Sequence, residues 1–207
     1  MRIGLDFDNT IACYDKAILK LSEGIENLPS KISRTKSGIS NYLRTEGRES
    51  EWTVFQGELY GPGMKYAEPF NGAVATMQEL VDLGHELIIV SHRSRTPYAG
   101  KPHDLHAAAR RWIKYNLQKE GLFKTHTETE NIHFLESLKA KISTISSLSC
   151  DAFVDDLPKV LLDSGLHMNM GKILFDPSVE KKQFASKKMA RIFSWTELPL
   201  VINQLCA

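Results

Sequence analysis

Two carboxylates on alternate residues stand near the start of the chain, in the segment Asp6-Phe7-Asp8-Asn9-Thr10. They follow an apolar run from Met1 to Leu5 that is typical of a buried strand. Because side chains alternate along a strand, Asp6 and Asp8 are expected to point to the same side, where their charges repel. Such a pair requires that one carboxyl be protonated or that a cation lie between them. The spacing therefore favours chemistry that uses a metal ion or a transferred proton.

Polar residues also end two later apolar runs. Ser91 follows the run 87–90, and the pair Asp155-Asp156 stands at the end of the run 152–154. Each alone is more typical of a strand end or a helix start, where serine and aspartate are favoured by capping and by the helix dipole. Together with the first pair, they suggest one cluster of functional groups.

A lysine between these runs completes the set. Lys139 and Lys141 both stand near the start of a helical pattern, and two residues so spaced point to different faces of a helix. We favour Lys141 because of its offset from the acidic pair, with Lys139 as the alternative.

Strand-like and helix-like segments alternate after residue 66, and they must position these groups. The expected strands are 86–90, 132–135, 152–155 and 172–175, and the expected helices are 71–83, 104–117, 138–148, 158–163 and 196–205. Repeats of this kind need crossover connections, which favour a doubly wound, mostly parallel α/β sheet of the Rossmann-like class with helices on both faces. Functional groups are then expected outside the carboxyl ends of the strands.

Residues 14–66 interrupt this series between the first two strands of the sheet. The interval is polar and helical in pattern, ends in Gly61-Pro62-Gly63, and is too long for an ordinary crossover. We therefore expect a helical cap at 14–66, inserted into a catalytic core of residues 1–13 and 67–207, that closes as a lid. Its aromatic residues Trp52, Phe55 and Tyr60 are expected to form a small core rather than a substrate pocket.

The bulk composition excludes several classes of protein. The chain has 207 residues, 42% of them hydrophobic and 25% charged, as in soluble globular proteins. Its 26 Lys and Arg against 25 Asp and Glu leave no basic surface for a nucleic acid polymer or an anionic membrane. Three widely spaced cysteines indicate neither a disulfide framework nor a zinc site. No run approaches the length of a membrane span and no signal peptide is evident, so we expect a cytoplasmic protein.

The ordered set of DxDxT, serine, lysine and acidic pair resembles the haloacid dehalogenase-like superfamily of phosphohydrolases, and the cap after the first strand is similar to 5′-nucleotidase-type members. The resemblance implies that Asp6 is the nucleophile and forms an aspartyl-phosphate. It implies that Asp8 protonates the leaving oxygen and later takes a proton from water. It also implies a Mg²⁺ ion held by the Asp6 carboxylate, the Asp8 carbonyl and the acidic pair, with Asp156 as the usual direct ligand and Asp155 as its supporting partner.

The remaining roles follow from the same resemblance. Ser91 would donate to a phosphoryl oxygen, and Lys141 would stabilise the phosphoryl group and the crowded carboxylates. Four aspartates near one lysine leave about three uncompensated negative charges, which demands a divalent cation if a phosphate is to enter. Thr10 is expected to brace the loop or orient Asp8.

A basic segment, 92–103, follows Ser91. Its side chains His92, Arg93 and Arg95 could bind a second anionic or sugar group of the substrate; the alternative is a solvated loop.

The sequence thus predicts a Mg²⁺-dependent phosphatase acting on a small phosphorylated metabolite, either a sugar phosphate or a nucleotide. Two alternatives share the fold: a catalytically weak protein that binds a phosphorylated ligand or regulates, and a phosphomutase. A phosphorylation-dependent receiver domain is disfavoured, because there the acidic pair comes near the first strand and the phosphorylated aspartate ends the third.

Overall fold

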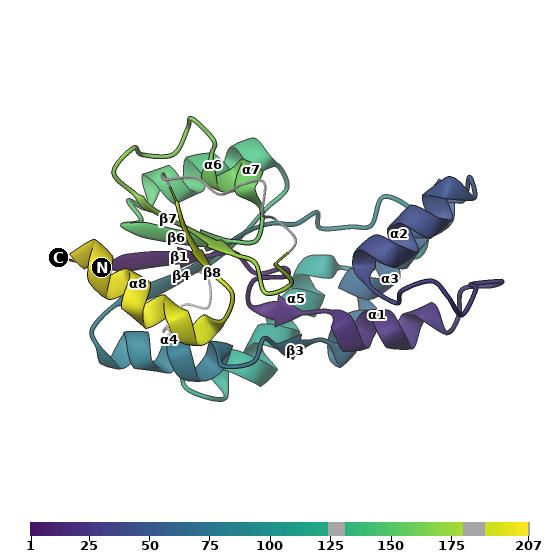
Figure 1. Cartoon of the computed structure of the whole chain (residues 1–207), viewed down its shortest axis with the longest axis horizontal. Coiled ribbons are helices and arrows are strands. Elements are labelled where there is room, and N and C mark those ends of the chain that lie inside the picture. The colour runs from purple at the N-terminus through teal and green to yellow at the C-terminus, as the bar shows by residue number, and fades with distance from the viewer. Residues whose placement is uncertain (124–130, 180–188, 207) are drawn as a thin grey trace. The chain divides into compact units, whose positions relative to one another are not determined.

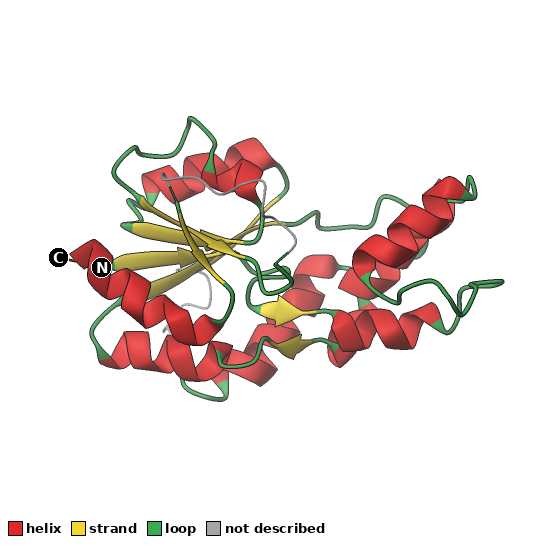
Figure 2. Ribbon diagram, in the orientation of Figure 1, coloured by secondary structure: helices red, strands yellow, loops and turns green. Residues whose placement is uncertain are grey.

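A computed structural model of the chain describes residues 1–123, 131–179 and 189–206, which form two compact units (Figures 1 and 2). Unit 1 comprises Met1–Ala12, Pro69–Arg93 and Leu117–Ala207, and unit 2 comprises Cys13–Glu68 and Ser94–Asn116. The predicted cap boundaries, 14–66, remain a prediction. Unit 2 differs from them by including residues 94–116, which the sequence analysis assigned to the core.

Unit 1 is built on a six-stranded sheet in the order β5-β4-β1-β6-β7-β8. Its strands are β1 (Arg2–Leu5), β4 (Glu86–His92), β5 (Ile132–Leu135), β6 (Ala152–Asp155), β7 (Gly171–Phe175) and β8 (Ala190–Ile192). All of the neighbouring strands pair in parallel. The predicted α/β class is confirmed. The short β8 was not predicted, because three residues carry too little periodicity to indicate a strand.

Helices cover both faces of this sheet, as Figure 1 shows. Helices α4 (Ala73–Asp82) and α8 (Leu198–Cys206) lie on one face, and α6 (Leu138–Ser147) and the short α7 (Pro158–Leu161) lie on the other. A 3₁₀ turn, Trp195–Glu197, precedes α8. Strand order reverses at β1, whose neighbours β4 and β6 continue the sheet in opposite directions. The carboxyl end of β1 is therefore where a site is expected.

The central strand β1 is buried on both faces. Ile3 and Leu5 have no exposed surface, and Gly4 lies between Ile88 of β4 and Phe153 of β6 in the sheet register. A Cβ atom on Gly4 would lie only 2.4 Å from Cδ2 of Phe153. The close packing of this ring against the backbone of β1 therefore requires glycine.

Unit 2 is helical. It contains α1 (Asp15–Ser22), α2 (Lys36–Thr45), α3 (Glu49–Tyr60) and α5 (Leu105–Ile113), with a 3₁₀ helix at Pro62–Tyr66. A π-helical turn at Lys114–Gln118 follows α5 and runs into unit 1. Trp52 and Phe55 are buried and stack with ring centroids 5.7 Å apart. The half-buried Tyr60 packs edge-on against Tyr14 at 5.2 Å. These aromatic residues form a small core, as expected.

Two short strands, β2 (Ala12–Cys13) and β3 (Glu68–Pro69), pair with each other at two of the four places where the chain passes from one unit to the other. Among the helices of the described residues, none combines the length and apolar character needed to cross a membrane.

Candidate active site

A tight loop at the end of β1 carries the paired aspartates. Both Ile11 and Ala12 donate their backbone N–H groups to the Phe7 carbonyl oxygen, at 3.1 and 2.9 Å. Asn9 adopts a left-handed conformation, with φ of 60°, and donates its N–H to the Ala12 carbonyl at 3.0 Å. Asparagine accepts this conformation more readily than most residues. The sequence after Asp8 therefore folds the chain back immediately and holds this loop at the sheet edge.

Lys141 joins the ends of two strands. Its Nζ atom lies 2.6 Å from Oδ1 of Asp6 and 2.6 Å from Oδ2 of Asp155. The lysine side chain is 2% exposed and projects from the first turn of α6, where Ser137 caps the helix by accepting the N–H of Ala140. Lys139, the alternative from the sequence, is exposed. Helical periodicity therefore places Lys141 at the aspartates.

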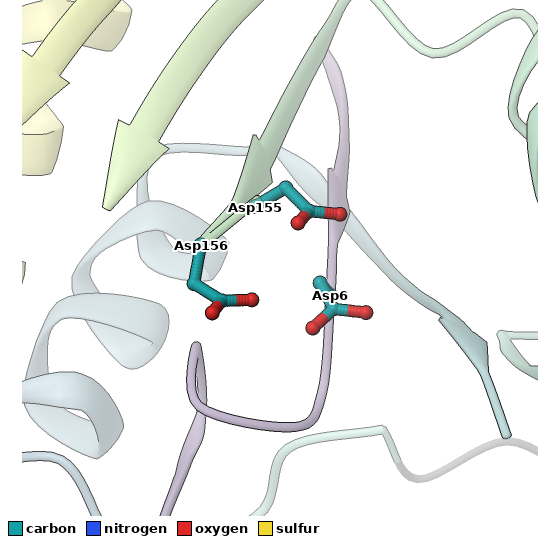
Figure 3. Close-up of side chains that lie close together, drawn as sticks. All are labelled: Asp6, Asp155 and Asp156. Atoms are coloured by element: carbon teal, nitrogen blue, oxygen red, sulfur yellow. The ribbon is translucent and has the colours of Figure 1, made fainter. Parts of the chain in front are cut away.

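Three carboxylates form a cluster suited to a metal ion. One oxygen atom from each of Asp6, Asp155 and Asp156 lies within 4.8 Å of the others, and Figure 3 shows the side chains around a common space. Carboxylate oxygens are the hard ligands that Mg²⁺ prefers. Oδ2 of Asp155 accepts from Lys141, and its Oδ1 accepts the N–H of Leu157 at 2.7 Å.

Both Asp155 oxygens thus already accept hydrogen bonds, and Asp156 is half-buried. The expected division of roles, with Asp156 as the direct ligand and Asp155 as its supporting partner, remains a prediction.

Arg93 changes the charge count made from the sequence. Its Nη1 atom lies 2.5 Å from Oδ1 of Asp8, and its side chain is 3% exposed. The expectation of a single cation beside four aspartates is wrong: Lys141 and Arg93 together supply two positive charges. Four carboxylates therefore leave a formal excess of two negative charges, the charge that one divalent cation neutralises.

Burial and charge both shift the proton affinities of the site. Burial raises the pKa of Asp6 from its usual 3.8 to about 8, Lys141 opposes this rise, and Asp155, Asp156 and Asp8 add to it. Burial by itself would lower the pKa of Lys141, but the carboxylates of Asp6 and Asp155 outweigh burial and raise it. The ammonium is therefore charged, while Asp6 needs more positive charge nearby to ionise at neutral pH.

Ser91 is buried at the end of β4, with 1% of its surface exposed. Its hydroxyl has no hydrogen-bond partner among the described residues. A buried hydroxyl without a partner is costly. It is suited to donating to a bound phosphoryl oxygen.

The other predicted binding residues are placed differently from one another. Thr10 is buried, with its hydroxyl 3.5 Å from Oδ2 of Asp6. His92 is exposed, whereas Arg93 is buried, as strand alternation requires. Arg95 belongs to unit 2, is exposed, and pairs with Asp104 at 3.4 Å. Of these four residues, Thr10 and Arg93 contact the paired aspartates through side-chain hydrogen bonds.

Trp195 was missed by the sequence analysis. Its indole Nε1 donates to the carbonyl oxygen of Thr10 at 2.9 Å, and the residue is 1% exposed. Its ring packs against Phe175 at the end of β7, with centroids 6.1 Å apart. Its own carbonyl accepts from Thr76 at 3.3 Å. The C-terminal part of unit 1 thus supports the loop that carries the aspartates, across 185 residues of sequence.

No family model matches the chain. A curated Bacillus cereus protein with the name "Putative nucleotidase" is 23% identical over 220 residues, covering 99% of each chain.

Solved structures show the fold. A haloacid dehalogenase-like hydrolase from Streptococcus pneumoniae has a TM-score of 0.61 at 11% identity, over 97% of each chain. A "predicted phosphoglycolate phosphatase" from Haemophilus somnus has a TM-score of 0.60 at 11% identity, over 97% of this chain and 96% of that one. A hydrolase of the same family from Deinococcus radiodurans, with bound phosphate and sodium, has a TM-score of 0.58 at 12% identity, over 99% and 96%. The fold of this chain is that of the haloacid dehalogenase-like hydrolases.

Proposed function

We propose that the protein is a Mg²⁺-dependent phosphatase that hydrolyses a small phosphate monoester through an aspartyl-phosphate on Asp6. The observation that carries the proposal is that Lys141 contacts both Asp6 and Asp155. These two carboxylates form one cluster with Asp156. A buried ammonium bonded to two carboxylates fixes the nucleophile and adds positive charge where a phosphoryl group would develop negative charge.

The proposed reaction has two steps. An oxygen of Asp6 attacks phosphorus, the bond from phosphorus to the leaving oxygen breaks, and the Asp8 carboxyl gives its proton to that oxygen, which departs as the alcohol. Water then attacks the phosphorus of the aspartyl-phosphate while Asp8 takes a proton from it. The bond from phosphorus to Asp6 breaks, and inorganic phosphate leaves. Lys141 and Ser91 bind phosphoryl oxygens in both steps.

The acidic cluster supports a cation as part of this site. When bound, Mg²⁺ neutralises charge on the phosphoryl oxygens and the carboxylates. Asp6 and Asp156 would hold it through their carboxylates, with the Asp8 carbonyl, while Asp155 would orient Lys141. Positive charge at this position also favours the ionised, nucleophilic form of Asp6.

Nucleotides are the first substrates to test, because the Bacillus cereus relative carries a nucleotidase name. Sugar phosphates and phosphoglycolate follow, the latter because of the Haemophilus somnus structure. We propose that unit 2 acts as the cap, contributing contacts to the part of the substrate beyond the phosphate.

The test measures inorganic phosphate release from these esters and from p-nitrophenyl phosphate, with Mg²⁺ and with EDTA. Wild-type turnover that requires Mg²⁺ and disappears in Asp6→Asn supports the proposal. Glu46→Gln, which changes an exposed carboxylate at the end of α2 in unit 2, is the matched control and should retain full activity. Phosphate transfer between positions of a sugar without phosphate release would indicate a mutase instead. Binding of the esters without turnover would indicate a binding protein.

A further inference from the structure

Arg93, the first residue after β4, is buried beside the Asp8 carboxylate. Only 3% of its side chain and 17% of the Asp8 side chain are exposed, and Nη1 donates to Oδ1 at 2.5 Å. A guanidinium carries its charge at every physiological pH and is costly to bury without an anionic partner. The ion pair therefore restricts both side chains.

Two further contacts fix the arginine itself. Its backbone N–H donates to the Leu135 carbonyl of β5 at 2.8 Å. Its guanidinium lies over the Phe7 ring, 5.8 Å from the centroid, and that ring packs edge-on against Phe134 with centroids 6.0 Å apart. Strand β5 therefore fixes the backbone of Arg93 and the Phe7 ring supports its guanidinium, so Asp8 meets an already ordered partner.

Asp8 is the member of the site that most needs orientation. Both aspartates follow the last residue of β1, Leu5. Asp6 still donates its N–H to the Val154 carbonyl of β6 at 2.9 Å and accepts from Lys141, whereas Asp8 lies two residues further on, in the tight loop. A group that gives a proton to a leaving oxygen must lie within hydrogen-bond reach of it, and a small misplacement costs a large part of the rate. The ion pairs of Lys141, the other buried cation, are with Asp6 and Asp155.

We propose that Arg93 is a positioning residue, which holds the Asp8 carboxylate in the orientation that delivers its proton to the leaving group. This inference rests on the proposed phosphatase function. The sequence-based interpretation, in which Arg93 binds an anionic or sugar group of the substrate directly, is the alternative that an experiment must separate from it.

The leaving group separates the two roles. The value of kcat/KM reports the first step, in which the bond from phosphorus to the leaving oxygen breaks. An alkoxide is a poor leaving group and needs the proton of Asp8, whereas p-nitrophenolate departs readily without one. Losing the orientation of Asp8 should therefore slow alkyl esters far more than p-nitrophenyl phosphate. Losing a contact to the phosphoryl group should slow both esters alike and should weaken inorganic phosphate as an inhibitor.

The experiment compares wild type, Arg93→Gln and Arg93→Lys with Mg²⁺, using p-nitrophenyl phosphate and an alkyl ester that the wild type hydrolyses. For Arg93→Gln we expect kcat/KM to fall by about 100-fold for the alkyl ester and by less than about 5-fold for p-nitrophenyl phosphate, given the usual size of general-acid effects. The inhibition constant of inorganic phosphate should stay within about 2-fold. Arg93→Lys should recover part of the alkyl activity, because an ammonium also pairs with a carboxylate.

A double-mutant cycle adds a second readout. In the Asp8→Asn background, Arg93→Gln should cause no further loss, because the group it orients is gone. This double variant leaves neither charge of the pair buried alone, so it tests the idea even if Arg93→Gln alone fails to fold. Arg44→Gln, which removes an exposed ion pair with Glu49 in unit 2, is the control and should change neither ester.

The outcomes are distinguishable. Equal losses on both esters with weaker phosphate inhibition, or a further loss in the Asp8→Asn background, would overturn the positioning role and leave the phosphatase intact. A wild type that hydrolyses neither ester nor any member of the substrate panel would overturn the proposed function and this inference together.

Discussion

The Asp6 carboxyl should make the metal-free protein less stable as the pH rises. Its pKa is raised from 3.8 to about 8 in the folded chain, chiefly by burial. Between these two values the folded state binds a proton more tightly than the unfolded state does, so the free energy of unfolding falls with increasing pH. The same linkage means that anything that neutralises this carboxylate should stabilise the fold at pH 8.

Asp6→Asn tests this reasoning, because the amide keeps the shape and an oxygen acceptor for Lys141 but cannot ionise. At 1.36 kcal/mol per pH unit, the raised pKa of Asp6 lowers the free energy of unfolding by about 2 kcal/mol at pH 5 and by about 5 kcal/mol at pH 8. Both values are relative to a carboxyl group whose pKa is the same in the folded and unfolded states. These are upper limits, since Lys141 and the other carboxylates adjust when Asp6 changes charge. Relative to the wild type in EDTA, we therefore expect the free energy of unfolding of the variant to rise by up to about 4 kcal/mol between pH 5 and pH 8.

Urea unfolding at the two pH values, followed by tryptophan fluorescence, measures this gain. Glu46→Gln is the control, because that carboxylate is exposed, and its effect should not change with pH. Added Mg²⁺ should raise the stability of the wild type at pH 8 more than that of Asp6→Asn. The reasoning is refuted if the variant and the wild type differ equally at pH 5 and pH 8, or if the difference shrinks at the higher pH.

Two other substitutions test the site and the fold. Lys141→Gln should lower kcat for any substrate by about 10³-fold, because a preorganised positive charge at the phosphoryl group is lost. Lys139→Gln, on the exposed face of the same helix, is the control and should leave kcat unchanged. Equal losses for the two variants in phosphate-release assays would contradict the assignment of Lys141. Gly4→Ala should destabilise the protein by about 1–3 kcal/mol in urea unfolding, because the new Cβ meets the Phe153 ring at 2.4 Å. Gly24→Ala, where the nearest atom lies 3.6 Å from a new Cβ, should cost much less, and similar costs at both positions would argue against close packing at β1.

Much of unit 1 could be predicted because its signals are local. Apolar runs of four or five residues mark the buried parallel strands, and polar residues at their ends mark the sheet edge that carries the site. The choice between Lys139 and Lys141 followed from helical spacing and an offset along the sequence, and the structure places Lys141 against Asp6. The sequence could not reveal β8, whose three residues have no pattern of their own.

The missed features are contacts between residues far apart in the chain. Arg93 was recognised only as part of a basic loop, since its pairing with Asp8 depends on β1 and β4 being neighbours with aligned ends. Trp195 gave no signal, because its hydrogen bond to Thr10 depends on how the C-terminal segment packs. Residues 94–116 looked like a core crossover, because a helical pattern does not say which unit the helix packs in.

The two buried cations divide the work of the site in a way that neither the motif nor the net charge suggests. Lys141 bonds to two carboxylates at once, so it fixes Asp6, the proposed nucleophile, but cannot balance the whole cluster. Arg93 pairs with Asp8 and is itself held by β5 and Phe7. The two unbalanced charges are therefore concentrated on Asp6 and the acidic pair, where a divalent cation is expected. Asp8, the proposed proton-transferring carboxylate, pairs with a different cation, so binding of the metal and orientation of Asp8 can be perturbed separately by mutation.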